Sequence, residues 1–338
     1  MMKTFSIIIP VYNGLMSLGR TLDSIYSQGM TNDSFEVICV DDCSPLMETF
    51  EMLNSYTYKG KHPCNLKVFR HKDNKRQGGA RNTALDHAEG EWVLYLDQDD
   101  HFLQGTLPVL QSRIEEYNDC DICMFDYQLV TKHSLSEKRI NSIYTNQSFK
   151  TEIISGADFI QKYPIPWAPW CYAYKKCFLV KHGMRFVENV RFPDTDYVMK
   201  ATLLAQNMVF IPLDVYCHIH YDENTSSVGN DRFRIEELFG LTDRMRNVAE
   251  SFMSVNERAA MAAMNHHIFR YSNLLKTILW RLPFSQIVEL LNNYTPYEKS
   301  ENQLVKYTRK YPRVYAVLAQ VVRPFLLTAV WVRNKVKK

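Results

Sequence analysis

The chain has 338 residues and a nearly balanced charge, with 40 Lys plus Arg against 37 Asp plus Glu. A net charge of +3 gives no general basis for binding nucleic acid, so that class of function is set aside. Hydrophobic residues make up 46% of the chain, which is ordinary for a soluble protein with a full core. The length allows one large α/β domain plus a smaller one.

The cysteines and the N-terminus bear on the cellular compartment. Cys120 and Cys123 form a Cys-x-x-Cys pair inside a strand-like run rather than at a turn, so we expect two half-buried thiols instead of a redox or zinc site. The sequence becomes strand-like from Phe5 and is interrupted by Pro10, which does not fit a signal peptide. Reduced thiols and a cytoplasmic location are the expectation.

The first half of the chain alternates between two apolar patterns. Short apolar runs typical of buried strands are followed by segments in which apolar residues recur every three or four positions, as in helices. This alternation predicts an α/β fold with a mixed, mostly parallel, Rossmann-like sheet sandwiched by helices. The expected strands are residues 5–11, 35–40, 66–70, 91–96 and 121–128, and the expected helices begin near Leu15, Gly79 and Gly105.

The second half has a mixed pattern. Short strands and an aromatic stretch at residues 167–174 precede a helix expected at 194–205 and a β-hairpin expected at 209–221. Beyond Asp231 the apolar spacing is helical, with prolines dividing it into short helices. We therefore predict two domains, residues 1–230 with the sheet and residues 231–338 as a helical C-terminal region.

Acidic residues follow the strand expected at 91–96. Asp97 and Asp99 lie two residues apart where the strand ends, and carboxylates this close raise each other's pKa unless a positive charge separates them. A hard divalent cation such as Mg²⁺ or Mn²⁺ is the usual solution. A solvated acidic turn is the alternative for an isolated Asp-x-Asp, but other polar clusters follow neighbouring strands.

Two of those clusters could bind a nucleotide. Asp41 and Asp42 come directly after the second strand, where a carboxylate can accept the N–H of a pyrimidine base or a ribose hydroxyl. Tyr12, at the end of the first strand, could stack on that base. In α/β sheets ligands bind beyond the carboxyl ends of the strands, where these residues are expected. An acidic turn without a ligand remains the alternative.

Residues 74–82 read Asn-Lys-Arg-Gln-Gly-Gly-Ala-Arg-Asn. Two glycines let a backbone approach a phosphate closely, and the following helix offers free N–H groups. Arg76 and Arg81 could add positive charge for a diphosphate. A glycine-containing helix start with surface arginines is an equally good interpretation of this segment alone.

These segments together resemble glycosyltransferase family 2, the inverting group with the GT-A fold. The matching text is residues 6–13 (Ser-Ile-Ile-Ile-Pro-Val-Tyr-Asn), 40–44, 79–82 and 96–100, in the order and spacing of the family. The resemblance is clear over residues 1–130, weaker to about 230 and absent beyond. It implies a nucleoside diphosphate sugar donor, most often a uridine diphosphate sugar, and a Mn²⁺ or Mg²⁺ ion.

The resemblance also implies roles for particular residues. Asp99 would ligate the cation that bridges the diphosphate, and Asp97 would hold the ribose or metal-bound water. Tyr12 would pack on the base and Asp42 would recognise its edge. The implied donor-binding residues are Pro10, Tyr12, Asp41, Asp42, Arg76, Arg81 and Asp97. Arg76 is a departure, because many members have Gly at that position.

Inverting transfer needs a base that takes the proton of the attacking acceptor hydroxyl. In the family this is an Asp in a Glu-Asp-like pair at a helix start, and Asp194 matches it, although Pro193 replaces the Glu. The alternative for Asp194 is a residue favoured at the helix N-terminus by the dipole. Asp196 is the reserve candidate.

Further residues are candidates by resemblance. His218 and His220 are expected on one face of a hairpin strand, where either could complete the metal shell or contact the diphosphate. Ser226 and Ser227 could bind phosphate oxygens nearby. Trp167 and Trp170 look similar to an acceptor-side aromatic stretch, with core packing as an equal alternative.

The C-terminal region is basic. Residues 314–332 are largely apolar but include Arg323 and Pro324, which argues against a membrane-spanning helix. Interrupted amphipathic helices flanked by basic residues suit an anionic membrane surface, and a helix packed on the catalytic domain with a solvated tail is the alternative. The residues that give this region its charge are Lys306, Arg309, Lys310, Arg313, Arg323, Arg333, Lys335, Lys337 and Lys338.

The predicted function is transfer of a sugar from a nucleoside diphosphate donor to a saccharide or lipid-linked saccharide acceptor, in surface polysaccharide synthesis. The inner face of the cell membrane is the expected place if the acceptor is lipid-linked. A catalytically weak or inactive nucleotide-sugar-binding protein of the same fold is the alternative. A dinucleotide-dependent dehydrogenase is excluded, because the first strand ends in Pro-Val-Tyr-Asn-Gly rather than Gly-x-Gly-x-x-Gly.

Overall fold

The computed structural model describes residues 3–133, 136–140, 144, 149–221, 232–277, 282–294 and 302–321. The chain divides into two compact units, Met1–Asn224 and Thr225–Lys338. Each unit has its own core and is described by itself.

The first unit is built on one mixed sheet. Over its described residues the strand order is β3-β2-β1-β4-β8-β6-β9-β5, with β7 paired to β6. Strands β1 to β4 run parallel to one another, whereas β8 is antiparallel to both β4 and β6. The strands are β1 (Phe5–Val11), β2 (Phe35–Asp41), β3 (Leu66–Arg70), β4 (Trp92–Tyr95), β5 (His101–Phe102), β6 (Ile122–His133), β7 (Ser136–Ile140), β8 (Tyr172–Lys175) and β9 (Met208–Tyr221).

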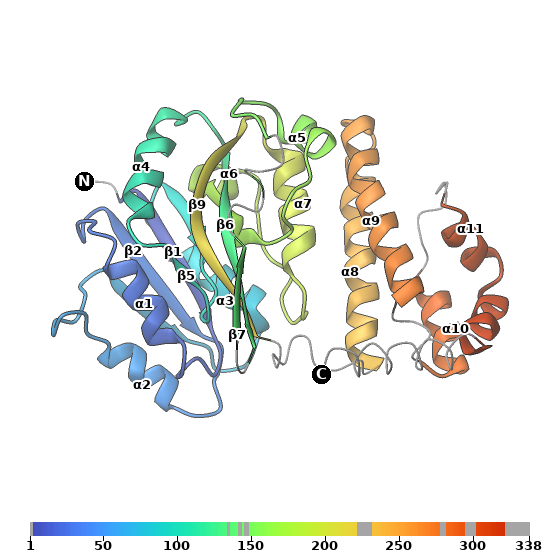
Figure 1. The fold of residues 1–338 in the computed structure, drawn as a ribbon, viewed down its shortest axis with the longest axis horizontal. Coiled ribbons are helices and arrows are strands. Elements are labelled where there is room, and N and C mark those ends of the chain that lie inside the picture. Colours follow the sequence, from blue (N-terminus) through green and yellow to red (C-terminus); the bar gives the residue numbers. More distant parts are fainter. Residues whose placement is uncertain are drawn as a thin grey trace. The chain divides into compact units, whose positions relative to one another are not determined.

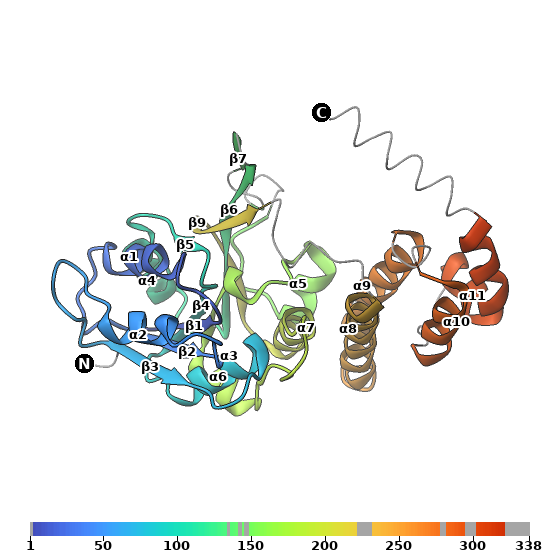
Figure 2. The same ribbon diagram turned by 90° about the horizontal axis from the view of Figure 1, so that it is seen from below.

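Helices cover both faces of this sheet (Figure 1). The chain moves outward from β1 to β3 through α1 and α2 and then returns to β4 through α3. Because such crossovers are right-handed, α1 and α2 lie on one face and α3 on the other, as Figure 2 shows. Every residue of β1 and β2 is buried as a result. The helices are α1 (Leu18–Tyr26), α2 (Glu48–Ser55), α3 (Arg76–Asp86), α4 (Thr106–Glu116), α5 (Gly156–Lys162), α6 (Lys176–Lys181) and α7 (Asp194–Leu204).

The β-hairpin predicted at residues 209–221 is wrong. These residues belong to the single strand β9, which pairs in parallel with β6. The register shifts between the pairs Phe125–Ile211 and Asp126–Asp214, so that Pro212 and Leu213 are additional residues on β9. Proline lacks the N–H of a paired strand residue and is tolerated at such a bulge, which explains a turn-like sequence without a turn.

The Cys-x-x-Cys pair is more deeply buried than predicted. Cys120 and Cys123 are free thiols with no exposed surface, rather than half-buried ones. Cys123 lies at the start of β6, which is flanked by β8 and β9, so that sheet neighbours enclose it on both sides.

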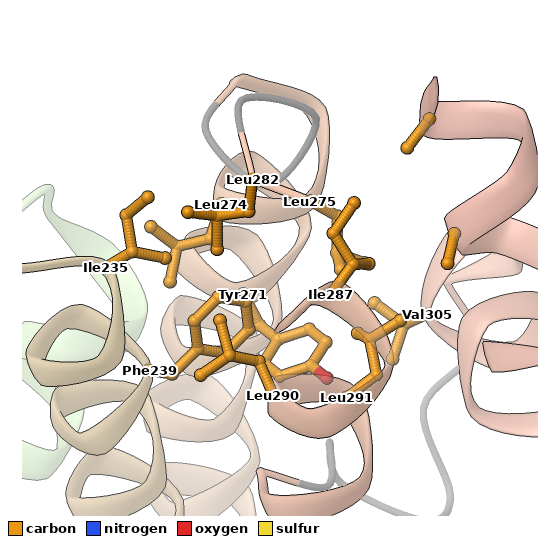
Figure 3. Packing of buried hydrophobic residues seen from close by; sticks show 12 residues of the cluster. Ile235, Phe239, Tyr271, Leu274, Leu275, Leu282, Ile287, Leu290, Leu291 and Val305 are labelled. Carbon is orange, nitrogen blue, oxygen red and sulfur yellow. The ribbon is translucent and has the colours of Figure 1, made fainter. Parts of the chain in front are cut away.

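The second unit is helical over its described residues. Its helices are α8 (Arg232–Ser251), α9 (Glu257–Thr277), α10 (Phe284–Asn293) and α11 (Gln303–Lys310), followed by helical residues 312–321. Buried side chains from all of these helices form one apolar core, shown in Figure 3. Within the described parts of both units, no helix is long and apolar enough to cross a bilayer.

Candidate active site

The polar residues that follow β1, β2 and β4 meet at one edge of the sheet. The N–H of Asp42 donates to the carbonyl of Val11 at 2.8 Å, and the N–H of Leu96 donates to the carbonyl of Ile8 at 2.9 Å. These bonds extend the parallel ladders to the carboxyl ends of the strands. The shared edge expected from the sequence is therefore present in the fold.

Gln98 fixes the backbone of Tyr12. Its side-chain oxygen accepts the N–H of Tyr12 and its amide donates to the carbonyl of Tyr12, both at 2.8 Å. Tyr12 itself is 43% exposed, so its ring stands at the edge of the sheet in a position suited to stacking. Sequence reasoning missed Gln98, whose role depends on the adjacency of β1 and β4.

Asp41 and Asp42 have different surroundings. Asp41 is fully buried. It accepts hydrogen bonds from Arg70 Nη1 at 2.5 Å and from the hydroxyl of Ser44. Asp42 Oδ1 accepts from His71 Nδ1 at 2.7 Å and from the N–H of Lys75 at 2.9 Å. Its Oδ2 is buried and has no hydrogen-bond partner among the described residues. Asp41 thus stabilises the loop, while Asp42 retains an acceptor for a ligand.

Arg81 joins two of the predicted site residues. It is completely buried in α3, and its Nη2 donates to Asp97 Oδ1 at 2.7 Å while Nη1 donates to Asp194 Oδ1 at 2.5 Å. The guanidinium carbon lies 5.1 Å from the centre of the Phe186 ring and 5.9 Å from that of Tyr95. The aromatic packing and the two carboxylates hold the charge in place. Rather than reaching into the solvent as a free cation for diphosphate, Arg81 positions Asp97 and Asp194.

Burial and neighbouring charges shift the pKa values of both carboxylates of the Asp-x-Asp. Burial raises the pKa of Asp97, although Arg81 acts in the opposite direction. Burial, together with the charges of Asp100 and Asp97, raises the pKa of Asp99 to about 6. Negative charge is therefore crowded at Asp99, which is the environment that favours a cation.

Asp100 links this acidic loop to β9. Its Oδ2 accepts from the hydroxyl of Tyr216 at 2.7 Å and pairs with His218 Nδ1 at 3.0 Å, and its Oδ1 accepts the N–H of Ile219 at 2.7 Å. Asp100 is 1% exposed, so it acts through His218 rather than on a ligand directly. Asp100 directly follows the Asp-x-Asp motif in the sequence, but the sequence alone did not indicate that it anchors β9.

His218 is the better placed of the two histidines. Burial opposes its protonation, but the hydrogen bond and charge of Asp100 outweigh burial, so the pKa of His218 is raised above 6.5. With Nδ1 held by Asp100, Nε2 is the ring nitrogen left to bind a metal or a phosphate oxygen. None of the hydrogen bonds and ion pairs found in the described chain joins His220 to the acidic loop. Ser226 and Ser227 lie outside the described residues.

The two tryptophans differ in exposure. Trp170 is 7% exposed and stacks on Tyr216 at a centroid distance of 4.3 Å and on His218 at 5.2 Å. These contacts support the packing alternative for Trp170, which braces the ring of His218. Trp167 is partly exposed and stays a prediction for the acceptor side.

Gly78 serves a different purpose from the one expected. A Cβ added there would lie 2.5 Å from the carbonyl oxygen of Val187 and 3.3 Å from the Cβ of Pro193. The absence of a side chain therefore lets the segment before α7 approach α3, which brings Asp194 to Arg81. Arg76, the first residue of α3, adopts a φ of +60° and is partly exposed.

The described residues include no group of three or more His, Cys, Asp or Glu side chains arranged around a metal. Magnesium is usually bound through one or two carboxylates together with substrate phosphates and water, so a nucleotide site does not require such a group. Asp99 with its crowded negative charge and His218 with its oriented ring fit that kind of site.

The sequence of the first unit matches one protein family. Residues 6–161 match the sequence model described as glycosyl transferase family 2. These residues belong to that family. The resemblance drawn from residues 6–13, 40–44, 79–82 and 96–100 is thereby confirmed.

One curated relative of the family 2 domain is the poly(ribitol-phosphate) beta-N-acetylglucosaminyltransferase TarS of Staphylococcus aureus. It is 39% identical over 118 residues, which are 35% of this chain and 20% of TarS. The matches to the first curated relatives cover a fifth of their length or less.

Solved structures of other glycosyltransferases share the fold. The crystal structure of S. aureus TarS 1-349 in complex with UDP-GlcNAc superposes with a TM-score of 0.72 at 20% identity, covering 94% of this chain and 91% of that one. The mannosyltransferase PcManGT from Pyrobaculum calidifontis, in complex with GDP-Man and Mn²⁺, gives a TM-score of 0.53 at 16% identity, covering 96% of this chain and 87% of that one. The predicted GT-A fold with a helical C-terminal part is confirmed.

Proposed function

We propose that this protein is an inverting glycosyltransferase that moves a sugar from a nucleoside diphosphate, most simply uridine diphosphate, to a hydroxyl of a saccharide or polyol-phosphate acceptor. The family of residues 6–161 supports this activity class. So do TarS, a poly(ribitol-phosphate) beta-N-acetylglucosaminyltransferase, and a second relative, the minor teichoic acid biosynthesis protein GgaB of Bacillus subtilis. A lipid-linked saccharide is a further acceptor of the same hydroxyl chemistry.

The single observation that carries the proposal is the bridge made by Arg81. It brings Asp97, at the end of β4, and Asp194, at the start of α7, to one guanidinium. Asp42 has its buried, unpartnered oxygen at the same edge of the sheet, after β2. A donor laid along this edge would have its base near Asp42 and Tyr12 and its sugar toward Asp97 and Asp194.

The proposed step is a direct displacement. Asp194 accepts the proton of the acceptor hydroxyl while that oxygen forms a bond with the anomeric carbon of the sugar. The bond from that carbon to the diphosphate breaks on the opposite side, and the diphosphate leaves with the electron pair. Asp194 is 27% exposed at its side chain, so an acceptor can reach it.

A divalent cation, when bound, would offset the charge that builds on the leaving diphosphate. Asp99 is the residue proposed to hold it, with His218 next to it and Asp97 through water. The negative charge around Asp99 and the ring orientation set by Asp100 support this assignment. Mn²⁺ in the complex of PcManGT makes that metal the natural choice for an assay.

The first test is turnover of a donor panel. Wild type and Asp194→Asn are incubated with UDP-GlcNAc, UDP-glucose, UDP-galactose and GDP-mannose in the presence of Mn²⁺, and release of the nucleoside diphosphate is measured. We expect Asp194→Asn to lower kcat by about 10²-fold or more with KM for the donor little changed. Asp158→Asn, which alters an exposed Asp in the first turn of α5, is the matched control. Equal turnover by wild type and Asp194→Asn would exclude Asp194 as the base.

A second test addresses the cation. Calorimetry measures the affinity for the same donor with and without Mn²⁺, for wild type, Asp99→Ala and the exposed control Asp119→Ala. Mn²⁺ should strengthen donor binding to wild type and to Asp119→Ala but not to Asp99→Ala. An equal gain in all three proteins would remove Asp99 from the metal site.

A nucleotide-sugar-binding protein without catalysis is the second candidate. Two observations favour it: Pro193 replaces the Glu expected beside Asp194, and Arg81 already holds the Asp194 carboxylate. Donor binding by calorimetry without release of nucleoside diphosphate, for every donor and a range of saccharide acceptors, would support this candidate over the enzyme.

A further inference from the structure

An exposed apolar stripe runs along the last described helix, residues 312–321 of the second unit. It consists of Val314, Val317, Leu318 and Val321, whose exposed fractions lie between 47% and 60%. Spacings of three and four residues put these side chains on one face of the helix. Ala316 and Ala319 of the same helix are buried in the core shown in Figure 3, so the apolar stripe faces away from that core.

Two hydrogen bonds fix this orientation. The hydroxyl of Tyr315 donates to the carbonyl of Leu275, and the side-chain amide of Gln320 donates to the carbonyl of Leu282 at 2.6 Å. Both bonds tie the helix to other parts of the unit. The helix cannot rotate to bury the apolar stripe without breaking them. The exposure of the stripe is therefore a property of the fold.

The surroundings of the apolar stripe are basic and aromatic. Tyr307 and Tyr311 are exposed, their rings lie 5.5 Å apart, and Nζ of Lys310 lies 5.1 Å from the centre of the Tyr311 ring. Arg313 is exposed beside the stripe. The sequence has no acidic residue after Glu301, while it has nine Lys and Arg. Apolar side chains with tyrosines and basic residues at their border are typical of a helix that lies in a membrane interface.

We propose that the apolar stripe docks on the surface of an anionic bilayer, with Lys310 and Arg313 at the lipid phosphates. Positive charge is complementary to such a surface. A second copy of the chain is a poorer occupant, because a symmetric contact through the same stripe would bring two basic borders together. This inference stands independently of the proposed transfer reaction, although it would bring the enzyme to a lipid-linked acceptor.

Vesicle flotation of the full chain tests the proposal. Wild type should float with vesicles of phosphatidylcholine mixed with phosphatidylglycerol, and much less with phosphatidylcholine alone. Val317→Ser combined with Leu318→Ser should lower the partition coefficient by about tenfold or more, because apolar surface is lost from the contact. The control is Val255→Ser, which removes a valine that is 78% exposed elsewhere in the unit and should float as wild type does.

A second variant separates charge from apolar contact. Lys310→Gln combined with Arg313→Gln should weaken flotation with the anionic vesicles, and added salt should weaken the wild type in the same way. Release of nucleoside diphosphate from a soluble donor should be unchanged in all of these variants. Membrane docking can therefore be disproved while the proposed transferase activity stands, and the activity can be disproved while membrane docking stands.

Three outcomes would overturn the proposal. One is equal flotation of wild type and the Val317→Ser, Leu318→Ser variant. Another is self-association of wild type without vesicles that this variant abolishes, which would assign the apolar stripe to a second copy. The third is a lower melting temperature of the variant with no vesicle binding by either protein, which would mean that the chain itself covers the stripe.

Discussion

Arg81 and Asp194 lie 113 positions apart in the chain, yet Nη1 of Arg81 donates to Oδ1 of Asp194 at 2.5 Å. The contact joins the middle of α3 to the first residue of α7. Because Asp97 accepts from the other terminal nitrogen of the same guanidinium, the donor side and the acceptor side of the proposed site share one buried positive charge. The position of the proposed base is thus coupled to the Asp-x-Asp loop.

Removing the shared charge should damage both stability and turnover. Arg81→Met would leave Asp97 and Asp194 without their common partner, and breaking a buried ion pair from one side typically costs about 3–5 kcal/mol. Urea unfolding measures the stability, and release of nucleoside diphosphate measures turnover. Arg185→Met is the control, since its pair with Asp86 is about half exposed and should contribute less than about 1 kcal/mol. Equal losses in the two variants would contradict the role given to Arg81.

Gly78 should be required for the distance between α3 and α7. Gly78→Ala places a Cβ against the carbonyl of Val187 and against Pro193, so the segment that carries Asp194 must move. We expect kcat to fall by about tenfold or more while donor affinity is retained. The reason is that the acceptor side of the site is displaced, whereas the sheet edge proposed to bind the nucleobase is not. Steady-state kinetics and calorimetry separate these quantities. Gly240→Ala, in an open position of α8, is the control and should keep full activity. If Gly78→Ala lost donor affinity with kcat unchanged, the result would support a phosphate-binding role for this segment rather than a packing role for Gly78.

Asp42 should govern affinity for the nucleoside. In Asp42→Asn one oxygen can still accept from His71 and Lys75, but the amide that replaces Oδ2 cannot accept a hydrogen bond from a base or ribose. The affinity for uridine diphosphate, measured by calorimetry, should fall by about tenfold or more. Asp73→Asn, at an exposed position of the loop after β3, should bind as wild type does. Unchanged affinity in Asp42→Asn would move base recognition elsewhere.

The second unit should lose stability in mild acid through His267. Its Nδ1 pairs with the carbonyl of Thr242 at 2.7 Å, and burial lowers the pKa of His267 to about 4, with Arg246 acting in the same direction. The unfolded chain takes up this proton near pH 6.5 and the folded chain only near 4, so stability is present above pH 6.5 and is lost as the pH falls through that window. The loss between pH 7.5 and pH 5 should be about 2 kcal/mol.

Amide hydrogen exchange in α8 and α9 measures this loss in the intact chain. His267→Asn retains an N–H donor for the carbonyl of Thr242 but does not titrate, so it serves as the matched control. The difference between wild type and His267→Asn in the protection of these amides from exchange should become smaller or change sign as the pH falls from 7.5 to 5, because only the wild type loses stability through this histidine. A constant difference over that range would show that His267 does not carry the pH dependence.

The sequence predicted the elements whose signal is local. The parallel strands β1, β2 and β3 and the helices α3, α4 and α7 follow from runs and spacings of apolar residues, with ends displaced by a few residues. The β-hairpin at 209–221 was wrong because Pro212 resembles a turn residue, while the pairing of β9 with β6 depends on residues more than eighty positions away. Local pattern does not carry such long-range pairing.

For the proposed site, the sequence by itself determined the candidates: Tyr12, Asp42, Asp97, Asp99 and Asp194 are recognisable from strand ends and family motifs. Tertiary structure alone decided which contacts these residues and their neighbours make. It turned Arg81 inward between two carboxylates, gave Gln98 to the backbone of Tyr12 and made Asp100 the anchor of His218. These roles depend on distances between segments that only packing brings together, because hydrogen bonds and burial act through space and leave no periodicity along the chain.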